Sequence, residues 1–435
     1  MTRDNTLDAV RRARIELIRD GRWKEADLLA GEAVARAVTA SPVPGPDPAD
    51  LAYVPGCPEA GWSVPGVLVF RAVQAANRGT GRTEAAGTAR HVLTWAESLD
   101  ASAFWQAVTV LVHADEIALA HRHWTCSAHR YGRDVHDLLG GRILVRRGDA
   151  RAAVRLLDGA LGRGVRPRLR VVAAAWLALA LVETGDLARA QAVLETERAT
   201  AEHPDAAELH FARGRVLLAG GRDAAALEEF LDCGRRADRF GVVNPAVLPW
   251  RSSAALAAVG AGDLVLARVC ADKDLVAARR WGGPRALGLA LHASALARGG
   301  DDVLLEEAVT CLGRASAGGE ALRARHDLAQ LLLSRGEVER ARGHVRCLRE
   351  EALCPQWTRM ADELAHRLLR NDGESALSGQ QRRIAVLARA GKSNREIAAE
   401  LGLTSRTVEF HLTTVYRKMG VRGRPGLRRA FVPTA

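Results

Sequence analysis

Near one end of the chain lie residues whose side chains suit the bases and phosphates of a nucleic acid. Between positions 392 and 418 these are Lys392, Asn394, Arg395, Ser405, Arg406, Thr407, Glu409, Phe410, Thr413, Arg417 and Lys418. Cationic and amide groups bind phosphate oxygens, whereas carboxylate, hydroxyl and aromatic groups can contact base edges. The set predicts contact with double-stranded DNA, provided that helices present these residues on one surface.

Capping residues and apolar spacing predict the helices that carry this set. A first helix is expected from Gln380 to Ala390, because Gly391 stops it. Ser393 begins a second helix, and Glu396, three residues later, completes a capping box. This second helix is expected to end near Leu401, just before Gly402.

A third helix is expected to begin after Thr404, and a short fourth over residues 424–431. The third has an apolar stripe at spacings i, i+4, i+7 and i+11, formed by Val408, Leu412, Val415 and Met419. A three-residue turn containing glycine separates the second helix from the third, which is the spacing of a helix-turn-helix.

If the stripe faces a domain core, the other faces of the third helix are open to DNA. Glu409 can accept from a cytosine amino group, Phe410 can touch a thymine methyl group, and Thr413 can bond to either kind of base edge. Phosphate contacts are expected for Lys392, Asn394, Arg395, Thr407, Arg417 and Lys418. Two alternatives stay open: Thr407 can simply bond to its own backbone, and His411 can be a partly buried, hydrogen-bonded histidine.

The segment resembles the LuxR-type (GerE-type) DNA-binding domain of bacterial transcription regulators. The match rests on Leu377, Ser378, Gly391, Ser393, Asn394, Arg395, Glu396, Ile397, Ala398, Leu403, Thr407, Val408, His411, Lys418, Gly420, Val421 and Arg424. It departs from the family at Gln381, where glutamate is usual, and at Glu409, where many members carry lysine. The first departure affects an internal polar contact, and the second removes a phosphate or guanine contact.

The distribution of charge agrees with a nucleic-acid partner at this end only. Residues 377–435 hold 12 lysines and arginines and three acidic residues, a formal charge of +9 in a chain whose total is +11. The total alone is weak evidence, because the chain has 58 arginines and only four lysines, a bias that GC-rich coding produces.

The rest of the chain shows a repeat. A glycine, a polar residue and an alanine five positions after the glycine recur from Gly148, Gly185, Gly221, Gly262 and Gly336, with a partial copy at Gly300 that has Leu305 in place of alanine. An isolated early copy begins at Gly21. Glycine ends one helix, the acidic residue begins the next, and alanine lets the two approach. The spacing of 36 to 41 residues loosely resembles tetratricopeptide repeats.

Three domains follow from these patterns. Residues 1–66 are expected to hold a helical segment and a Pro-rich loop, because seven of the 15 prolines lie between positions 41 and 66. Residues 67–370 are expected to form the repeat domain, with a last helix over 355–369 and a break at NDGESA, residues 371–376. Residues 377–435 form the third domain.

Composition predicts the fold class and the compartment. Alanine and leucine dominate and aromatics are only 4%, which favours an all-α protein: a tetratricopeptide-like hairpin array followed by a four-helix LuxR-type helix-turn-helix domain. Seven scattered cysteines without a C-x-x-C pair suggest neither disulfides nor a zinc site. The longest apolar run, residues 171–182, is shorter than the roughly 20 residues of a membrane span. We expect a soluble cytoplasmic protein.

Two other chemical signals are weak. His121, His123, Cys126, His129 and His136 fit no standard zinc pattern, and histidines in a segment between helices are the preferred interpretation. The Gly-Lys-Ser at 391–393 is no P-loop, because Val386 stands where the first glycine belongs. We therefore expect no bound metal, no cofactor and no enzymatic activity.

The sequence thus supports one hypothesis over two others. The first is a DNA-binding transcription regulator, by resemblance an activator, whose repeat domain receives a signal or partner. Its expected partners are double-stranded DNA and RNA polymerase or another protein, with a homodimer possible and no membrane. The alternative is a protein-binding scaffold whose last domain contacts a partner. The third, a sensor or enzyme built on the His/Cys cluster, has the least support.

Overall fold

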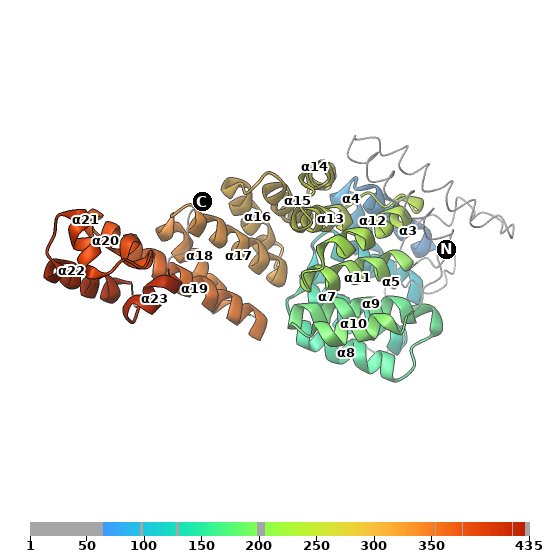
Figure 1. Cartoon of the computed structure of the whole chain (residues 1–435). Helices are drawn as coiled ribbons and strands as arrows, with labels where there is room; N and C mark the ends of the chain where they lie inside the picture. The colour runs from blue at the N-terminus through green and yellow to red at the C-terminus, as the bar shows by residue number, and fades with distance from the viewer. Residues whose placement is uncertain are drawn as a thin grey trace, which may run out of the picture. The chain divides into compact units, whose positions relative to one another are not determined.

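The computed structural model describes residues 64–95, 99–127, 130–197, 205–352, 354–375, 377–419 and 421–430. These residues form helices and no strand (Figure 1), so the all-α prediction is confirmed for this part of the chain. They divide into two compact units, one ending at Ala324 and the other beginning at Arg325. The predicted limits 67–370 and 377–435 stay predictions. Of the N-terminal segment 1–66, all but the last three residues lie outside the described ranges.

The first unit is a series of helices in which most helices pack against their neighbours along the chain. They are α3 (Val64–Arg78), α4 (Arg82–Thr94), α5 (Ala101–His113), α6 (Ile117–Cys126), α7 (Arg133–Arg146), α8 (Ala150–Gly162), α9 (Pro167–Thr184), α10 (Leu187–Glu195), α11 (Ala206–Ala219), α12 (Asp223–Arg239), α13 (Trp250–Gly260), α14 (Leu264–Trp281), α15 (Pro284–Ala297) and α16 (Asp302–Arg314). Helix α17 (Gly318–Ser334) crosses the boundary between the units.

The repeated glycine lies at the turn of each predicted hairpin within the described residues, whereas the early copy at Gly21 falls outside them. At the α9–α10 turn, Gly185 has a φ of 82°, the left-handed conformation that glycine adopts without strain. The Asp186 N–H then bonds to Leu181 O at 3.0 Å, and the Asp186 side chain accepts from Arg189 N at 3.2 Å. The turn therefore satisfies backbone groups of both helix ends, as the sequence pattern requires.

The alanine of each repeat lies where paired helices meet. Ala153, Ala190, Ala226, Ala267 and Ala341 are fully buried, and so is Leu305, which replaces alanine in the partial copy. Helix α8 shows how the second helix of a hairpin packs: Ala153, Leu157 and Ala160 are buried on one face, and the opposite face is exposed. The first helices α5, α9, α13 and α15 are buried over most of their length.

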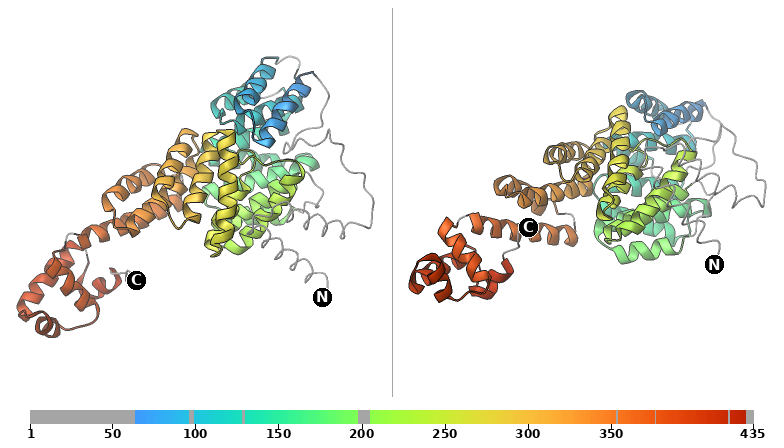
Figure 2. Two further views of the ribbon diagram at one scale, coloured as in Figure 1. Left: turned by 90° about the horizontal axis from the view of Figure 1, so that it is seen from above. Right: turned by 45° about the horizontal axis from the view of Figure 1, so that its top comes forward.

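Segments far apart in the sequence meet within the first unit. Asn244, in the connection before α13, donates from Nδ2 to Ala76 O of α3 at 2.7 Å. Trp281 of α14 donates from Nε1 to His113 O of α5 at 3.0 Å. Helices α3 and α4 accordingly lie beside α13 and α14 in both views of Figure 2. The hairpins therefore curve until the early helices contact those some 170 residues later.

The second unit contains two further array helices and a domain of four short ones. They are α18 (Val338–Glu350), α19 (Pro355–Ser375), α20 (Gly379–Arg389), α21 (Asn394–Leu401), α22 (Ser405–Lys418) and α23 (Gly423–Ala430). The four expected helices of the terminal domain are therefore present, with ends within a residue or two of the expected ones.

Two predicted loop segments are partly helical. Helix α3 begins at Val64, so the last residues of the predicted Pro-rich loop 41–66 are helical; Pro65 is tolerated because the first turn of a helix needs no backbone donor there. Helix α19 continues to Ser375, through most of the break predicted at 371–376. That segment contains no proline, and one glycine costs a helix only about 1 kcal/mol.

No helix among the described residues is both long and apolar enough to cross a membrane. The apolar run 171–182 lies in α9, inside the first unit, where Trp176 and its neighbours are buried.

Candidate nucleic-acid interface

One small hydrophobic core holds the four terminal helices together. Each of α20, α21, α22 and α23 contributes to it, and its buried members are Leu377, Ile384, Ala385, Ala388, Ile397, Ala398, Val408, Leu412, Val415, Met419 and Leu427. The apolar stripe predicted for the third helix supplies four of them. This packing fixes which face of α22 is turned away from the core.

Local hydrogen bonds fix the start of α21. Ser393 Oγ accepts from Glu396 N at 3.3 Å, and Glu396 Oε2 accepts from Ser393 N at 2.6 Å. The bond from the Ser393 backbone is the largest of the effects that lower the pKa of Glu396. The predicted capping box is therefore present.

The turn before α22 is equally well defined. Gly402 takes a left-handed conformation with a φ of 65°, and Leu403 N bonds back to Ala398 O at 2.9 Å. Thr404 Oγ1 then accepts from Thr407 N at 3.1 Å. Residues 402–404 thus form the short turn of a helix-turn-helix between α21 and α22.

Helix α22 has one anchored face and one exposed face. Val408, Leu412, Val415 and Met419 are buried in the core. The exposed residues include the base-contact candidates Glu409, Phe410 and Thr413, and also Ser405, Arg406, Arg417 and Lys418. Phe410 is 68% exposed, so its ring is accessible to a ligand. An exposed aromatic beside charged and hydroxyl groups is a suitable surface for base edges.

The hydroxyl groups of α22 already make bonds within the helix. Thr413 donates from Oγ1 to Glu409 O at 3.0 Å, and its oxygen lone pairs can still accept. Thr407 is half-buried, with its Oγ1 2.8 Å from Thr404 Oγ1. The Thr407 side chain thus makes a local bond, although to the Thr404 hydroxyl and not to its own backbone, while His411 has a buried Nδ1 with no hydrogen-bond partner among the described residues.

The phosphate-contact candidates differ in how far they are already engaged. Arg395 is exposed, as Arg417 and Lys418 are. Lys392 is half-buried and forms an ion pair with Glu400. Asn394 accepts through Oδ1 from Arg424, which also donates to Lys392 O. Arg424 thereby joins α23 to the turn between α20 and α21.

Sequence reasoning missed two of these structural contacts. From the sequence, Arg424 is only a residue of the family pattern. No local signal in the sequence indicates that its guanidinium group bonds to Asn394, 30 positions earlier in the chain. Lys418, predicted as a phosphate contact, donates from Nζ to Gln381 Oε1 at 2.9 Å. The same Gln381 oxygen accepts from Ser378 N at 3.1 Å. At Gln381, where the family usually has glutamate, the polar contact is thus made by an amide.

The described members of the histidine and cysteine cluster do not form a metal site. His121, His123 and Cys126 lie on α6, which corrects the expectation that they belong to an inter-helix segment; His129 is outside the described residues. The Trp124 ring lies between His121 and His136, at 5.3 and 4.9 Å between ring centroids. No group of three or more His, Cys, Asp or Glu residues in the described ranges is arranged to hold a metal ion.

Comparison with known proteins assigns the terminal domain. Residues 375–430 match the family described as "Bacterial regulatory proteins, luxR family". Over 58 residues the chain is 41% identical to "Transcriptional regulatory protein MctR" of Rhizobium johnstonii, a match that covers 13% of this chain and 27% of that protein. The chain thus spans about a quarter of this curated relative.

One solved structure matches over most of the chain but superposes poorly. It is titled "Structure of Naa15/Naa10 bound to HypK-THB" and is 12% identical, with 95% of this chain and 78% of that chain covered and a TM-score of 0.21. A superposition at this level carries no argument about fold or function.

Proposed function

Since residues 375–430 form a LuxR-type helix-turn-helix domain, we propose that this protein is a sequence-specific regulator of transcription that binds double-stranded DNA. The observation that carries the proposal is the division of α22 into a buried apolar stripe and an exposed face with Arg406, Glu409, Phe410 and Thr413. Such a helix can lie in the major groove while its other side stays packed on the domain.

Within this proposal the exposed residues have different roles. Glu409 accepts from a cytosine amino group, Phe410 packs on a thymine methyl group, and Thr413 accepts from a base edge. Arg395 and Arg417 bind phosphates directly, because they are exposed. Lys392 can do so only by leaving Glu400, which lowers its net contribution.

We further propose that the helical array receives a signal or a protein partner and that the protein acts as an activator, without enzymatic activity of its own. RNA polymerase is the expected partner of an activator, and a homodimer would bind half-sites about one helical turn apart. The extensive array supports the reception role, because stacked hairpins offer large surfaces to ligands and partners.

The experiment is a titration of the full chain with its own upstream DNA at several salt concentrations. Binding to a specific site should weaken with salt, with a slope in log K of about −0.9 for each phosphate contacted. The variant Arg417→Ala should weaken binding to every sequence and reduce this slope by about one contact. Arg389→Ala, on α20, is the matched control for loss of one positive charge in the same domain.

The outcome separates the regulator from the scaffold. Selection of bound duplexes from a random pool should enrich one sequence if α22 reads bases. Failure to bind any duplex in a salt-dependent way, together with a stable protein complex that forms without DNA, would favour the scaffold instead.

A further inference from the structure

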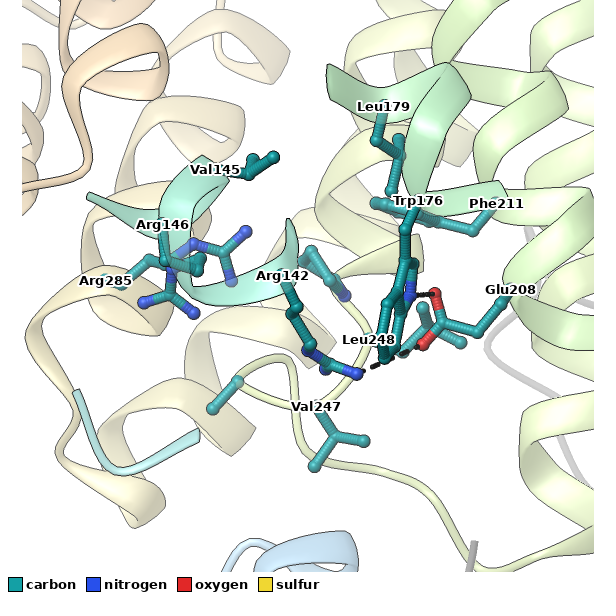
Figure 3. Close-up of a pocket in the computed structure, with 12 residues that line it drawn as sticks. Arg142, Val145, Arg146, Trp176, Leu179, Glu208, Phe211, Val247, Leu248 and Arg285 are labelled. Carbon is teal, nitrogen blue, oxygen red and sulfur yellow. Dashed lines mark hydrogen bonds and ion pairs between the residues drawn. The ribbon is translucent and has the colours of Figure 1, made fainter. Parts of the chain in front are cut away.

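A cavity in the first unit has an unusual lining. Its volume is about 100 Å³, and three arginines line it, Arg142 and Arg146 from α7 and Arg285 from α15. Glu208 of α11 is the one acidic residue of the lining, so the wall carries three guanidinium groups against one carboxylate. Figure 3 shows Arg142, Trp176 and Glu208 grouped on one side and Arg146 with Arg285 on the other.

The counter-ions of two of these arginines lie outside the lining. Arg285 Nε donates to Glu320 Oε2 at 2.7 Å, and Arg146 Nη2 donates to Asp115 Oδ1 at 2.7 Å. Neither Glu320 nor Asp115 lines the cavity. These pairs hold the guanidinium groups in place, which is the preorganisation that recognition of an anion requires.

Arg146 and Arg285 remain charged although their side chains are largely buried. Burial, and next the positive charge of Arg285, lower the pKa of Arg146 to about 10, so Arg146 stays protonated near neutral pH. For Arg285, burial is the largest single effect and lowers the pKa, but the attraction and hydrogen bond of Glu320 and the charges of Asp115 and Glu183 together outweigh it and raise the pKa. His113 adds no charge: an arginine can only donate, and Arg142 Nη2 lies 2.9 Å from His113 Nε2, so that ring nitrogen is the acceptor of a neutral imidazole.

Buried polar atoms of the lining have unused hydrogen-bonding capacity. Arg146 Nε and Glu208 Oε1 have no hydrogen-bond partner among the described residues. Glu208 Oε1 lies 3.9 Å from Arg142 Nη1, too far for a hydrogen bond. Buried polar groups are rarely left in this state, and an acceptor that entered the cavity could bond to Arg146 Nε.

The remainder of the lining is apolar and limits the size of a ligand. Trp176, Leu179, Phe211 and Val247 contribute apolar side chains. A cavity of roughly 150 Å³ in another protein accommodates benzene, so one of about 100 Å³ has room for an apolar body of roughly four carbons. The Arg142, Arg146 and Arg285 side chains remain 14%, 11% and 12% exposed, so solvent reaches the charged part of the wall.

We propose that this cavity binds a small organic acid, with its carboxylate on Arg142 and Arg146 and its compact apolar body against Trp176 and Leu179. A carboxylate matches the planar fork of a guanidinium, and the apolar wall disfavours a fully hydrated inorganic anion. The assignment rests on the proposed role of the array as the receiver of a signal, and it names the chemical class of that signal.

The first test is calorimetric titration of the full chain, without DNA, with isobutyrate and with isobutyramide, which has nearly the same shape and no charge. We expect saturable one-to-one binding of isobutyrate with a Kd of about 1 mM or tighter, and none of isobutyramide. Equal binding of the amide would overturn the proposal. So would the absence of isobutyrate binding at concentrations about a hundred times that Kd. Preference for inorganic phosphate would likewise rule out an organic acid.

Matched variants locate the site. Arg142→Gln should weaken isobutyrate binding about tenfold or more, because a charge-assisted bond is lost. Arg251→Gln is the control: Arg251 is as buried as Arg142, faces Asp238 at 3.4 Å and lies over the Trp250 ring at 4.4 Å, but does not line the cavity. Equal loss in both variants would overturn the assignment.

A third variant covers the case in which Arg142→Gln does not fold. Leu179→Phe keeps every charge and fills the apolar part of the cavity, and it should abolish isobutyrate binding while circular dichroism stays unchanged. Undiminished binding to a folded Leu179→Phe protein would contradict the proposal. Because these measurements contain no DNA, their failure is distinguishable from a failure of the terminal domain to bind DNA.

Discussion

Arginine is common in both the hairpin array and the terminal domain, but the two regions use it differently. In the array, arginines such as Arg146, Arg215 and Arg285 are largely buried and paired with carboxylates of other helices or turns. In the terminal domain, Arg395, Arg406 and Arg417 are exposed, and the domain has few acidic residues to pair with them. The same side chain therefore holds helices together in one region and is available to phosphates in the other.

The comparison explains why net charge alone is a poor guide to function. The array carries most of the arginines and is almost neutral, because its acidic residues neutralise them internally. A protein attracts a polyanion strongly only where its basic residues are exposed and are not neutralised by nearby acidic residues. Burial and pairing therefore decide what an arginine contributes.

The largest effect is expected from breaking a buried pair in the array. Arg285→Met leaves the Glu320 carboxyl group largely buried without its main partner, since burial alone would raise the pKa of Glu320 and Arg285 lowers it in the native protein. Removal of one partner of a buried pair costs about 3–5 kcal/mol. Urea unfolding of the full chain, followed by circular dichroism, should show this loss. Arg298→Met, in the exposed pair with Asp272, should cost less than about 1 kcal/mol. Equal losses of unfolding free energy in the two variants would contradict the contrast between buried and exposed arginine pairs.

A double substitution sharpens the same comparison. If the cost of Arg285→Met comes from the stranded carboxylate, then Arg285→Met combined with Glu320→Leu should recover most of it, because both charges are gone. The same unfolding experiment measures the recovery. A double variant as unstable as the single one would mean that the Arg285 side chain acts through packing and not through its charge.

The next effect concerns the exposed face of α22. Glu409→Lys replaces an acceptor with a donor, so the base preferred at one position should change from cytosine to guanine, with discrimination of about 1–3 kcal/mol. Selection from a random duplex pool with both proteins measures the change. Arg417→Lys keeps the positive charge and should leave the selected sequence unchanged. If the Glu409→Lys protein binds DNA more tightly but selects the same sequence, residue 409 lies next to phosphates and does not contact bases.

A smaller effect should appear with pH in the array. Burial first, and then Arg142, Arg146 and Arg285, lower the pKa of His113 well below its usual value of 6.5. Unfolded chains therefore take up a proton below about pH 6.5 that the folded protein does not. Stability should fall with decreasing pH, by about 1.4 kcal/mol per pH unit for this one group.

Unfolding of wild type and His113→Gln at about pH 7 and pH 5.5 isolates that contribution. The glutamine oxygen can still accept from Arg142 but does not titrate, so the variant should lose less stability on acidification. His366→Gln, at an exposed position of α19, is the control and should behave as wild type. An unchanged pH dependence in His113→Gln would show that His113 is protonated in the folded protein.

Features set by local chemistry could be predicted from the sequence. The left-handed glycines Gly185 and Gly402 and the caps Ser393 and Thr404 lie where expected, because a helix end needs particular residues within a few positions of it. The division of α22 into a buried and an exposed face likewise follows from the helical spacing of its apolar residues. Thus the helices of the terminal domain and the surface that holds the candidate site were predictable.

Features that depend on tertiary packing could not. The Arg146–Asp115 and Arg285–Glu320 pairs join residues 31 and 35 positions apart, and any of the 58 arginines could have been chosen on spacing alone. The hydrogen bond from Arg424 to Asn394 also depends on tertiary packing, because the two residues are 30 positions apart in the sequence. Sequence also placed the end of α19 too early, since weak helix formers such as Asn371 and Gly373 disfavour a helix without forbidding it.

The smallest expected effect tests the contact at Gln381. Lys418 reaches the Gln381 amide oxygen at the surface, and Gln381→Glu would turn this bond into an ion pair while keeping the cap on Ser378. We expect a gain in stability of about 0.2–1 kcal/mol that declines with salt, because exposed pairs are weak and screened. Thermal unfolding at low and high salt measures it. Arg383→Gln, an exposed change on the same helix, is the control. If Lys418 mainly binds DNA, Gln381→Glu should also weaken DNA binding, since the new carboxylate competes with phosphate for the same ammonium group.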